Sequence, residues 1–289
     1  MFSALAIARL GIFGSRLPLA RTPAAVGLSY EDVSFLASDG VELRGWYVAA
    51  DVPRAPTIVW VHGWLWNRAG NIAGRVPFVD RDVDFLPVTR VLRDAGFNVL
   101  LFDLANHGES GKRLPLTQGP WESRDFVGAV RYLRSRPEVD PERIGVIGMS
   151  AGGNTALYGV PDCQPIRAVL AVQPTKVARF NARFALDMLG VFGPMIAVTS
   201  DLANVLMRAP LYRRHDPAVP ARALGSTVVQ YVHGAGDPWG ELSVIEAFSV
   251  ATPGSLGVII HPSSSGRYEG YGYVSTRTDE VVGFFREHL

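Results

Sequence analysis

Six short apolar runs constrain the fold of this chain more than any other feature of its sequence. Each run is five or six residues long and almost continuously apolar, without the alternation of polar and apolar residues that a half-exposed strand shows. Strands covered on both faces have this composition, and they occur in parallel sheets with helices above and below. The predicted strands are Thr57–Val61, Asn98–Phe102, Ile144–Gly148, Ala168–Val172, Thr227–Val232 and Leu256–Ile260.

Stretches with helical spacing of apolar residues lie between several of these runs. This alternation predicts an α/β fold with right-handed crossovers and a doubly wound, mostly parallel sheet. Before it, the turn signal Ser38-Asp39-Gly40 separates Tyr30–Ala37 from Val41–Val48, which predicts an N-terminal β-hairpin. The predicted helices are Val88–Ala95, Trp121–Ser135 and Asp279–His288.

The composition fits one large folded domain and narrows the range of partners. Of the 289 residues 48% are hydrophobic, and the formal net charge is only +1. Because the chain has no polybasic run, nucleic acid is not an expected partner, and we expect a small-molecule substrate instead. A single cysteine, Cys163, excludes an intramolecular disulfide and favours a reducing compartment, so we predict a cytoplasmic location.

The N-terminal residues 1–29 are predicted to be separate from the domain over residues 30–289. Met1–Ala20 is apolar but interrupted by Arg9 and Arg16, and only eight residues precede Arg9. A membrane-spanning helix takes about 20 apolar residues. We therefore expect no transmembrane span here, but a short helix that packs on the domain or makes a weak contact with an interface.

Gly148-Met149-Ser150-Ala151-Gly152 matches G-x-S-x-G and lies between a predicted strand and a helix-compatible run. In a nucleophile elbow, small neighbours allow the sharp turn that exposes a serine above the sheet. Ser150 is therefore the candidate nucleophile, and the alternative is a serine that caps a helix. After another strand, Trp64 is placed to donate its backbone N–H, together with that of Ala151, to an oxyanion. His62 beside it is interpreted as a structural hydrogen-bonding residue.

Four segments in this order resemble the α/β-hydrolases, in particular their serine esterase and acyl-peptidase branch. They are HGW at His62–Trp64, LLFDLANHGESG at Leu100–Gly111, RSRPEVDPERIGVIGMSAGG at Arg134–Gly153, and HGAGD at His233–Asp237. The resemblance extends from Tyr30 to Leu289. It implies the α/β-hydrolase fold and a serine acyl-enzyme mechanism that needs neither a cofactor nor a metal ion.

The resemblance also implies where the other two members of a catalytic triad lie. Asp237 occupies the position of the family's acid, which orients a histidine and stabilises its imidazolium. The family's histidine follows the last strand, and without a gap that position falls on Arg267. Arginine stays protonated and cannot act as a general base. The nearest histidine is His261, six positions earlier.

Two interpretations of the base remain open. In the first, a rearranged loop after His261 allows this histidine to reach Ser150. In the second, the triad is broken at Arg267, and the protein is an impaired hydrolase or a ligand-binding protein on a hydrolase fold.

The segment 175–225 interrupts the alternation of strands and helices. It follows Ala168–Val172, which is the sixth predicted strand when the two strands of the hairpin are counted. Its apolar spacing predicts two or three short helices, which we interpret as a small lid over the active site. The predicted substrate-binding residues are Leu65, Phe184 and Trp239, which suit an apolar acyl or alcohol group. The predicted function is therefore a lipase-like serine carboxylesterase, with peptidase, acyltransferase and non-catalytic binding protein as alternatives.

Overall fold

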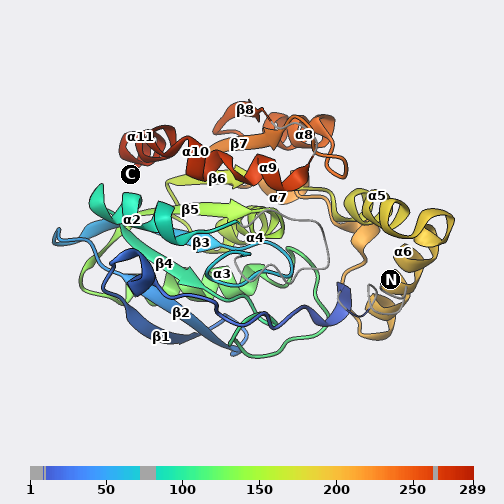
Figure 1. Ribbon diagram of the computed structural model, residues 1–289, viewed down its shortest axis with the longest axis horizontal. Coiled ribbons are helices and arrows are strands. Elements are labelled where there is room, and N and C mark those ends of the chain that lie inside the picture. Colours follow the sequence, from blue (N-terminus) through green and yellow to red (C-terminus); the bar gives the residue numbers. More distant parts are fainter. Residues whose placement is uncertain (1–8, 10, 72–82, 263–265) are drawn as a thin grey trace.

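The computed structural model describes the whole chain except residues 1–8, 10, 72–82 and 263–265, and the side chains of residues 192 and 194–200 are also left out. In the described part, eight strands form one sheet in the order β1-β2-β4-β3-β5-β6-β7-β8 (Figure 1). β1 (Glu31–Leu36) pairs with β2 (Glu42–Val48) and β2 with β4, both antiparallel, and the other pairs are parallel. This confirms the predicted hairpin and the doubly wound sheet.

All six predicted parallel strands are present. They are β3 (Ala55–Val61), β4 (Asn98–Phe102), β5 (Val139–Met149), β6 (Ala168–Val172), β7 (Val228–Gly234) and β8 (Ser255–His261). Only β5 differs much from its predicted bounds, because its less apolar beginning also pairs with β3, with Val139 opposite Ala55.

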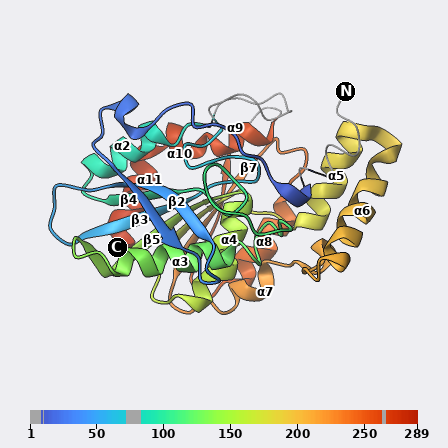
Figure 2. The ribbon, with the colours of Figure 1, turned by 90° about the horizontal axis from the view of Figure 1, so that it is seen from below.

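Successive residues of the central strands enter two different cores, one on each face of the sheet. In β3, Ile58 and Trp60 belong to one core, whereas Val59 and Val61 belong to the other. The strands are continuously apolar because neither face meets solvent. One face is covered by α3 (Ser123–Arg134), α4 (Ala151–Gly159), α7 (Ala218–Ala221) and α8 (Leu242–Ala251), and the other by α2 (Leu86–Asp94), α9 (Arg267–Tyr271), α10 (Tyr273–Thr276) and α11 (Thr278–His288) (Figure 2).

The connection from β6 to β7 contains the helices that the sequence predicts after the sixth strand. α5 (Val177–Leu189) leads through the 3₁₀ turn η3 (Gly190–Phe192) into α6 (Gly193–Leu206), and η4 (Tyr212–Arg214) follows. Both α5 and α6 are longer than the short helices expected. They extend away from the sheet on the side where the N-terminal part of the chain lies (Figures 1 and 2).

The described N-terminal residues pack on the domain. Residues 9 and 11–13 are helical, and the carbonyl of Ile12 accepts a hydrogen bond from the N–H of Leu116 at 2.9 Å. The carbonyl of Gly11 accepts from the Tyr212 hydroxyl at 3.1 Å, and Leu17 is buried. Among the described residues, none of the helices combines the length and apolar character that a bilayer span requires.

Candidate active site

Ser150 lies in a sharp turn between β5 and α4. Its backbone has φ 54° and ψ −115°, in the left-handed half of the map that only a tightly constrained serine adopts. The turn needs glycine at its neighbours, because a Cβ on Gly152 would lie 2.0 Å from the carbonyl oxygen of Val61. The N–H of Ser150 donates to the Val172 carbonyl at 2.8 Å, which ties the turn to β6. The geometry is that of a nucleophile elbow.

Two buried histidines hold the loop that follows β3. His62 contacts the Gly63 carbonyl through Nδ1 at 2.8 Å and accepts from the N–H of Leu104 through Nε2 at 3.0 Å. His107 contacts the Ala105 carbonyl and accepts from the N–H of Leu65 at 3.3 Å. Burial lowers the pKa of His62 to about 4 and that of His107 to about 3, so both rings are neutral at pH 7. These contacts agree with the structural role predicted for His62.

This loop and the elbow bring together the residues expected to hold an oxyanion. Ala151 follows Ser150 as the first residue of α4, and Trp64 lines the same small cavity as Ser150. The backbone N–H groups of Trp64 and Ala151 remain the predicted oxyanion donors.

The side chain of Asp237, beyond the end of β7, is fully buried. Its Oδ1 accepts from the N–H groups of Trp239 at 3.0 Å and Gly240 at 2.9 Å, so the carboxylate is fixed by the backbone that follows it. Its other oxygen, Oδ2, forms an ion pair with Nη1 of Arg267.

Arg267 lies between Ser150 and Asp237, where the family resemblance places a histidine. It begins α9 and is only 2% exposed, and its Nη2 lies 3.2 Å from the Oγ of Ser150. Burial by itself would lower the pKa of Arg267, but the Asp237 carboxylate outweighs burial and raises this pKa above its ordinary value. The guanidinium therefore stays protonated and donates to both residues that a catalytic histidine would join.

Two further residues that sequence reasoning missed complete this arrangement. Gln173 follows β6, and its amide group donates to the Arg267 carbonyl at 2.6 Å and accepts from the N–H of Gly234 at 3.2 Å. Nη2 of Arg267 in turn donates to the Gln173 carbonyl at 2.7 Å. The hydroxyl of buried Tyr271 interacts with both Ser150 and Arg267, and burial raises its pKa, so it stays a neutral phenol at pH 7. A polar residue directly after an apolar strand was the available signal for Gln173.

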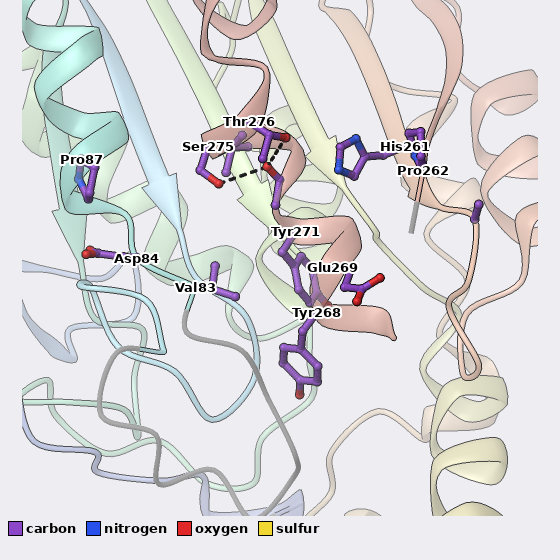
Figure 3. Close-up of a pocket in the computed structure, with 13 residues that line it drawn as sticks. Val83, Asp84, Pro87, His261, Pro262, Tyr268, Glu269, Tyr271, Ser275 and Thr276 are labelled. Atoms are coloured by element: carbon purple, nitrogen blue, oxygen red, sulfur yellow. Dashed lines mark hydrogen bonds between the residues drawn. The ribbon is translucent and has the colours of Figure 1, made fainter. Parts of the chain in front are cut away.

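His261 lies at the end of β8 on a different cavity. This cavity has a volume of about 870 Å³ and is bounded on one side by His261 and Pro262 and on the other by Asp84 and Pro87 (Figure 3). The ring of His261 packs edge-on against Tyr273, with 5.7 Å between ring centroids. In the part of the chain that the structure describes, no hydrogen bond joins His261 to Ser150 or Asp237. Residues 263–265, in the loop whose rearrangement the first interpretation requires, lie outside the described residues.

The cavity beside Ser150 is small and largely aromatic. Its volume is about 20 Å³, which is room for about one water molecule. Besides Ser150 and Arg267 it is lined by Trp64, Trp66, Gln118, Phe180, Tyr268 and Tyr271.

None of the three predicted substrate-binding residues is among the described residues that line this cavity. Leu65 belongs to the loop after β3, and its side chain is buried in the core. Phe184 and Trp239 pack behind Phe180, which stacks on Phe184 at a centroid distance of 5.7 Å. Among the described residues, no group of three or more His, Cys, Asp or Glu side chains is arranged to hold a metal ion.

The chain belongs to the alpha/beta hydrolase family, whose sequence profile matches residues 58–277. Thiohydrolase aneE of Aspergillus aculeatus is 31% identical over 163 residues, which are 56% of this chain and 46% of aneE. The uncharacterized protein YfhR of Salmonella typhimurium is 30% identical over 223 residues, covering 72% of this chain and 66% of YfhR. The chain thus spans between about half and two thirds of the length of these relatives.

Solved structures share the fold over nearly the whole chain. The esterase Pf2001 of Pyrococcus furiosus has a TM-score of 0.74 and 22% identity, and the match covers 95% of this chain and 97% of that one. The alpha/beta hydrolase GrgF from Penicillium has a TM-score of 0.66 and 17% identity, over 90% of this chain and 99% of its own. At these identities the likeness shows the fold alone.

Proposed function

We propose that this protein binds a carboxylic ester or thioester with an apolar acyl or alcohol group at Ser150, and hydrolyses it slowly or not at all. The observation that carries the proposal is the position of Arg267, which contacts Ser150 and Asp237 from the place of the catalytic histidine. A serine becomes a nucleophile only when a neighbouring group takes its proton. Among the described residues, the side chains that contact the hydroxyl of Ser150 are a protonated guanidinium and a neutral phenol, and neither can take its proton near pH 7.

The ligand class follows from the groups around Ser150. Backbone N–H donors at Trp64 and Ala151 would hold a carbonyl oxygen, and the aromatic lining suits an apolar substituent. Esterase Pf2001 and thiohydrolase aneE are similar proteins whose names indicate ester and thioester chemistry. Because the cavity in the structure is small, Phe180 or Tyr268 must move to admit a ligand, and α5 would cover that ligand as a lid, with Phe184 and Trp239 behind it.

Hydrolysis and binding together test this proposal. We expect the wild type to hydrolyse p-nitrophenyl butyrate no faster than Ser150→Ala, because neither protein has a base at the serine. Both should bind the ketone in which a methylene group replaces the ester oxygen of that substrate, as measured by calorimetry. A wild type about a hundredfold faster than Ser150→Ala would contradict the loss of turnover, and absence of ketone binding would contradict the ligand class.

A second candidate is an active carboxylesterase in which His261 is the base. It is favoured by the position of His261 at the carboxyl end of β8, next to the strand that carries Asp237. Burial and Arg277 lower the pKa of His261, so its imidazole is neutral at pH 7 and able to accept a proton. This mechanism requires the loop after β8 to bring the ring within about 3 Å of the Oγ of Ser150.

The two candidates differ in their response to one substitution. If His261 is the base, His261→Ala should reduce hydrolysis of p-nitrophenyl butyrate by about a hundredfold or more, and Arg267→Ala should leave most of it intact. If the proposal above is right, His261→Ala leaves the low rate unchanged.

A further inference from the structure

Exposed apolar side chains are concentrated on the helices that follow β6. The described part of the chain has sixteen exposed large hydrophobic residues, and seven of them lie between positions 186 and 207. Four of these seven lie in the last turn and a half of α6 or directly after it: Leu202, Val205, Leu206 and Met207. Clusters of exposed apolar side chains on a folded domain mark surfaces that bind another protein, a membrane or a ligand.

Three of these residues share one face of α6. Leu202, Val205 and Leu206 have the spacing i, i+3 and i+4, which places them side by side on a helix. They are 56%, 54% and 76% exposed, so this face is turned away from the domain. The end of α6 thus presents an apolar face for which no partner is found among the described residues.

Basic side chains border this apolar face. Arg208 lies two residues after α6, and Arg213 and Arg214 lie in η4; all three are exposed. The one acidic residue from 201 to 214 is Asp201, which lies 3.8 Å from Arg213 and accepts a hydrogen bond from the N–H of Tyr212 at 2.9 Å. This end of the molecule therefore combines exposed apolar side chains with a local excess of positive charge.

The N-terminal part of the chain adds to the same end of the molecule. The carbonyl of Gly11 accepts a hydrogen bond from the hydroxyl of Tyr212, in η4, at 3.1 Å. Phe13 is 45% exposed, and the guanidinium of Arg9 lies 5.9 Å from the centre of its ring.

Buried polar contacts hold this surface in place. The amide group of Asn204 donates to the Pro210 carbonyl at 3.1 Å, and the hydroxyl of buried Tyr212 reaches the Leu116 carbonyl at 2.7 Å. The segment is therefore anchored on its inner side while its apolar and basic side chains point outward.

We propose that this docking surface, made of Leu202, Val205, Leu206, Arg208, Arg213 and Arg214, binds the surface of a membrane that contains anionic phospholipids. The apolar side chains would enter the boundary between headgroups and acyl chains, and the arginines would pair with lipid phosphates. A second copy of this chain fits less well, because a symmetric contact would bring two positively charged surfaces together. The inference goes beyond the proposed function and does not depend on it.

Sedimentation of the full chain with lipid vesicles tests the inference. Vesicles of equal parts phosphatidylcholine and phosphatidylglycerol should bind about tenfold or more protein than phosphatidylcholine alone, and added salt should weaken the binding. The double variant Leu202→Glu/Leu206→Glu should lose about tenfold of this affinity. Arg213→Ala/Arg214→Ala should lose about fivefold for each arginine.

Val250→Glu is the matched control, because Val250 is 89% exposed on α8 and lies outside the docking surface. It should bind vesicles like the wild type, and thermal unfolding should show that all variants are folded. Equal binding of the wild type to both kinds of vesicle would overturn the inference, as would unchanged binding by Leu202→Glu/Leu206→Glu. Light scattering that shows a wild-type dimer and a monomeric Leu202→Glu/Leu206→Glu variant would also overturn it, in favour of a second copy.

Discussion

The carboxyl ends of β3 and β5 and those of β7 and β8 form two halves of one site, and they differ in how much of a hydrolase they keep. In the first half, Ser150 lies in a nucleophile-elbow turn, and His62 and His107 hold the loop that carries the predicted oxyanion donor Trp64. In the second half, the side chain of Asp237, the predicted acid, is buried and paired with Arg267, which lies where the family resemblance places a histidine. On the proposed function, the parts that position a substrate are kept, whereas the part that moves a proton has changed.

This difference shows that the shape of the site does not depend on the catalytic base. Arg267 donates to Asp237, to Ser150 and to the Gln173 carbonyl, so it satisfies the buried polar groups around it. A side chain that fills the position and pairs the carboxylate preserves the fold, while only a neutral imidazole would activate the serine. The predictions below separate these two roles.

The largest effect should come from Arg267→His. A histidine at this position would face Asp237 on one side and Ser150 on the other, so general-base catalysis becomes available. We expect the rate of p-nitrophenyl butyrate hydrolysis to rise by about a hundredfold or more. Steady-state kinetics with the purified variant measure it.

Two controls make this result specific. Arg267→Gln also removes the charge but supplies no base, and it should stay inactive. Arg267→His combined with Ser150→Ala should lose the gain, because the nucleophile is missing. If Arg267→His is no faster than the wild type, the missing base is not what limits turnover.

Loss of the buried ion pair should be the next largest effect. Asp237→Asn leaves the Arg267 guanidinium buried without a carboxylate, and we expect the free energy of unfolding to fall by about 3–5 kcal/mol. Glu241→Gln is the matched control, because Glu241 pairs with the half-exposed Arg179 and Arg183. It should lose less than about 1 kcal/mol in urea unfolding. Equal losses of unfolding free energy in the two variants would mean that the buried Arg267 guanidinium does not need the Asp237 carboxylate to stabilise it.

The two buried histidines that hold the loop after β3, His62 and His107, should make the stability of the protein depend on pH. Burial lowers the pKa of His62 to about 4 and that of His107 to about 3, from an ordinary value of 6.5. Between about pH 6.5 and pH 4 the unfolded chain binds protons that the folded chain excludes, so stability falls as the pH falls. Each histidine should contribute about 1.4 kcal/mol per pH unit in that window.

His107→Asn isolates one of these contributions, because its amide group can still donate to the Ala105 carbonyl. Unfolding free energies measured from about pH 7 to about pH 5 should fall less steeply in the variant than in the wild type. Identical slopes would show that the His107 ring is not kept neutral by burial.

The smallest effect concerns α5, which belongs to the predicted lid. Phe184→Leu should cost less than about 1.5 kcal/mol of stability, because the volume changes little, and should change the relative affinity for long and short alkyl ketones a few-fold. Phe126→Leu, an equally buried change on α3, should lose stability without altering ligand preference. If Phe184→Leu changes stability but not the relative affinity for the ketones, Phe184 packs in the core and does not contact the ligand.

Local sequence patterns determined the strands, the order of the fold and the position of the nucleophile. A strand buried on both faces must be apolar throughout, so the inner strands β3, β4 and β6 are recognisable without any tertiary information. β8 also has an apolar run, but it is an edge strand whose residues are all at least partly exposed. The elbow at Ser150 is equally local, since its glycines are required by backbone contacts within a few residues and with the adjacent strand end. Asp237 after β7 was predicted from the family resemblance and not from a local pattern.

The tertiary structure alone decided which side chain joins Ser150 to Asp237. The sequence left His261 and Arg267 as alternatives, because a few residues of loop separate two positions that face different cavities. It also gave little sign of Tyr271 or of the bracing role of Gln173, since these residues meet Arg267 only when β6, β7 and α9 pack together. Contacts between distant elements depend on packing and loop paths, and the periodicity of a sequence carries information only about each element by itself.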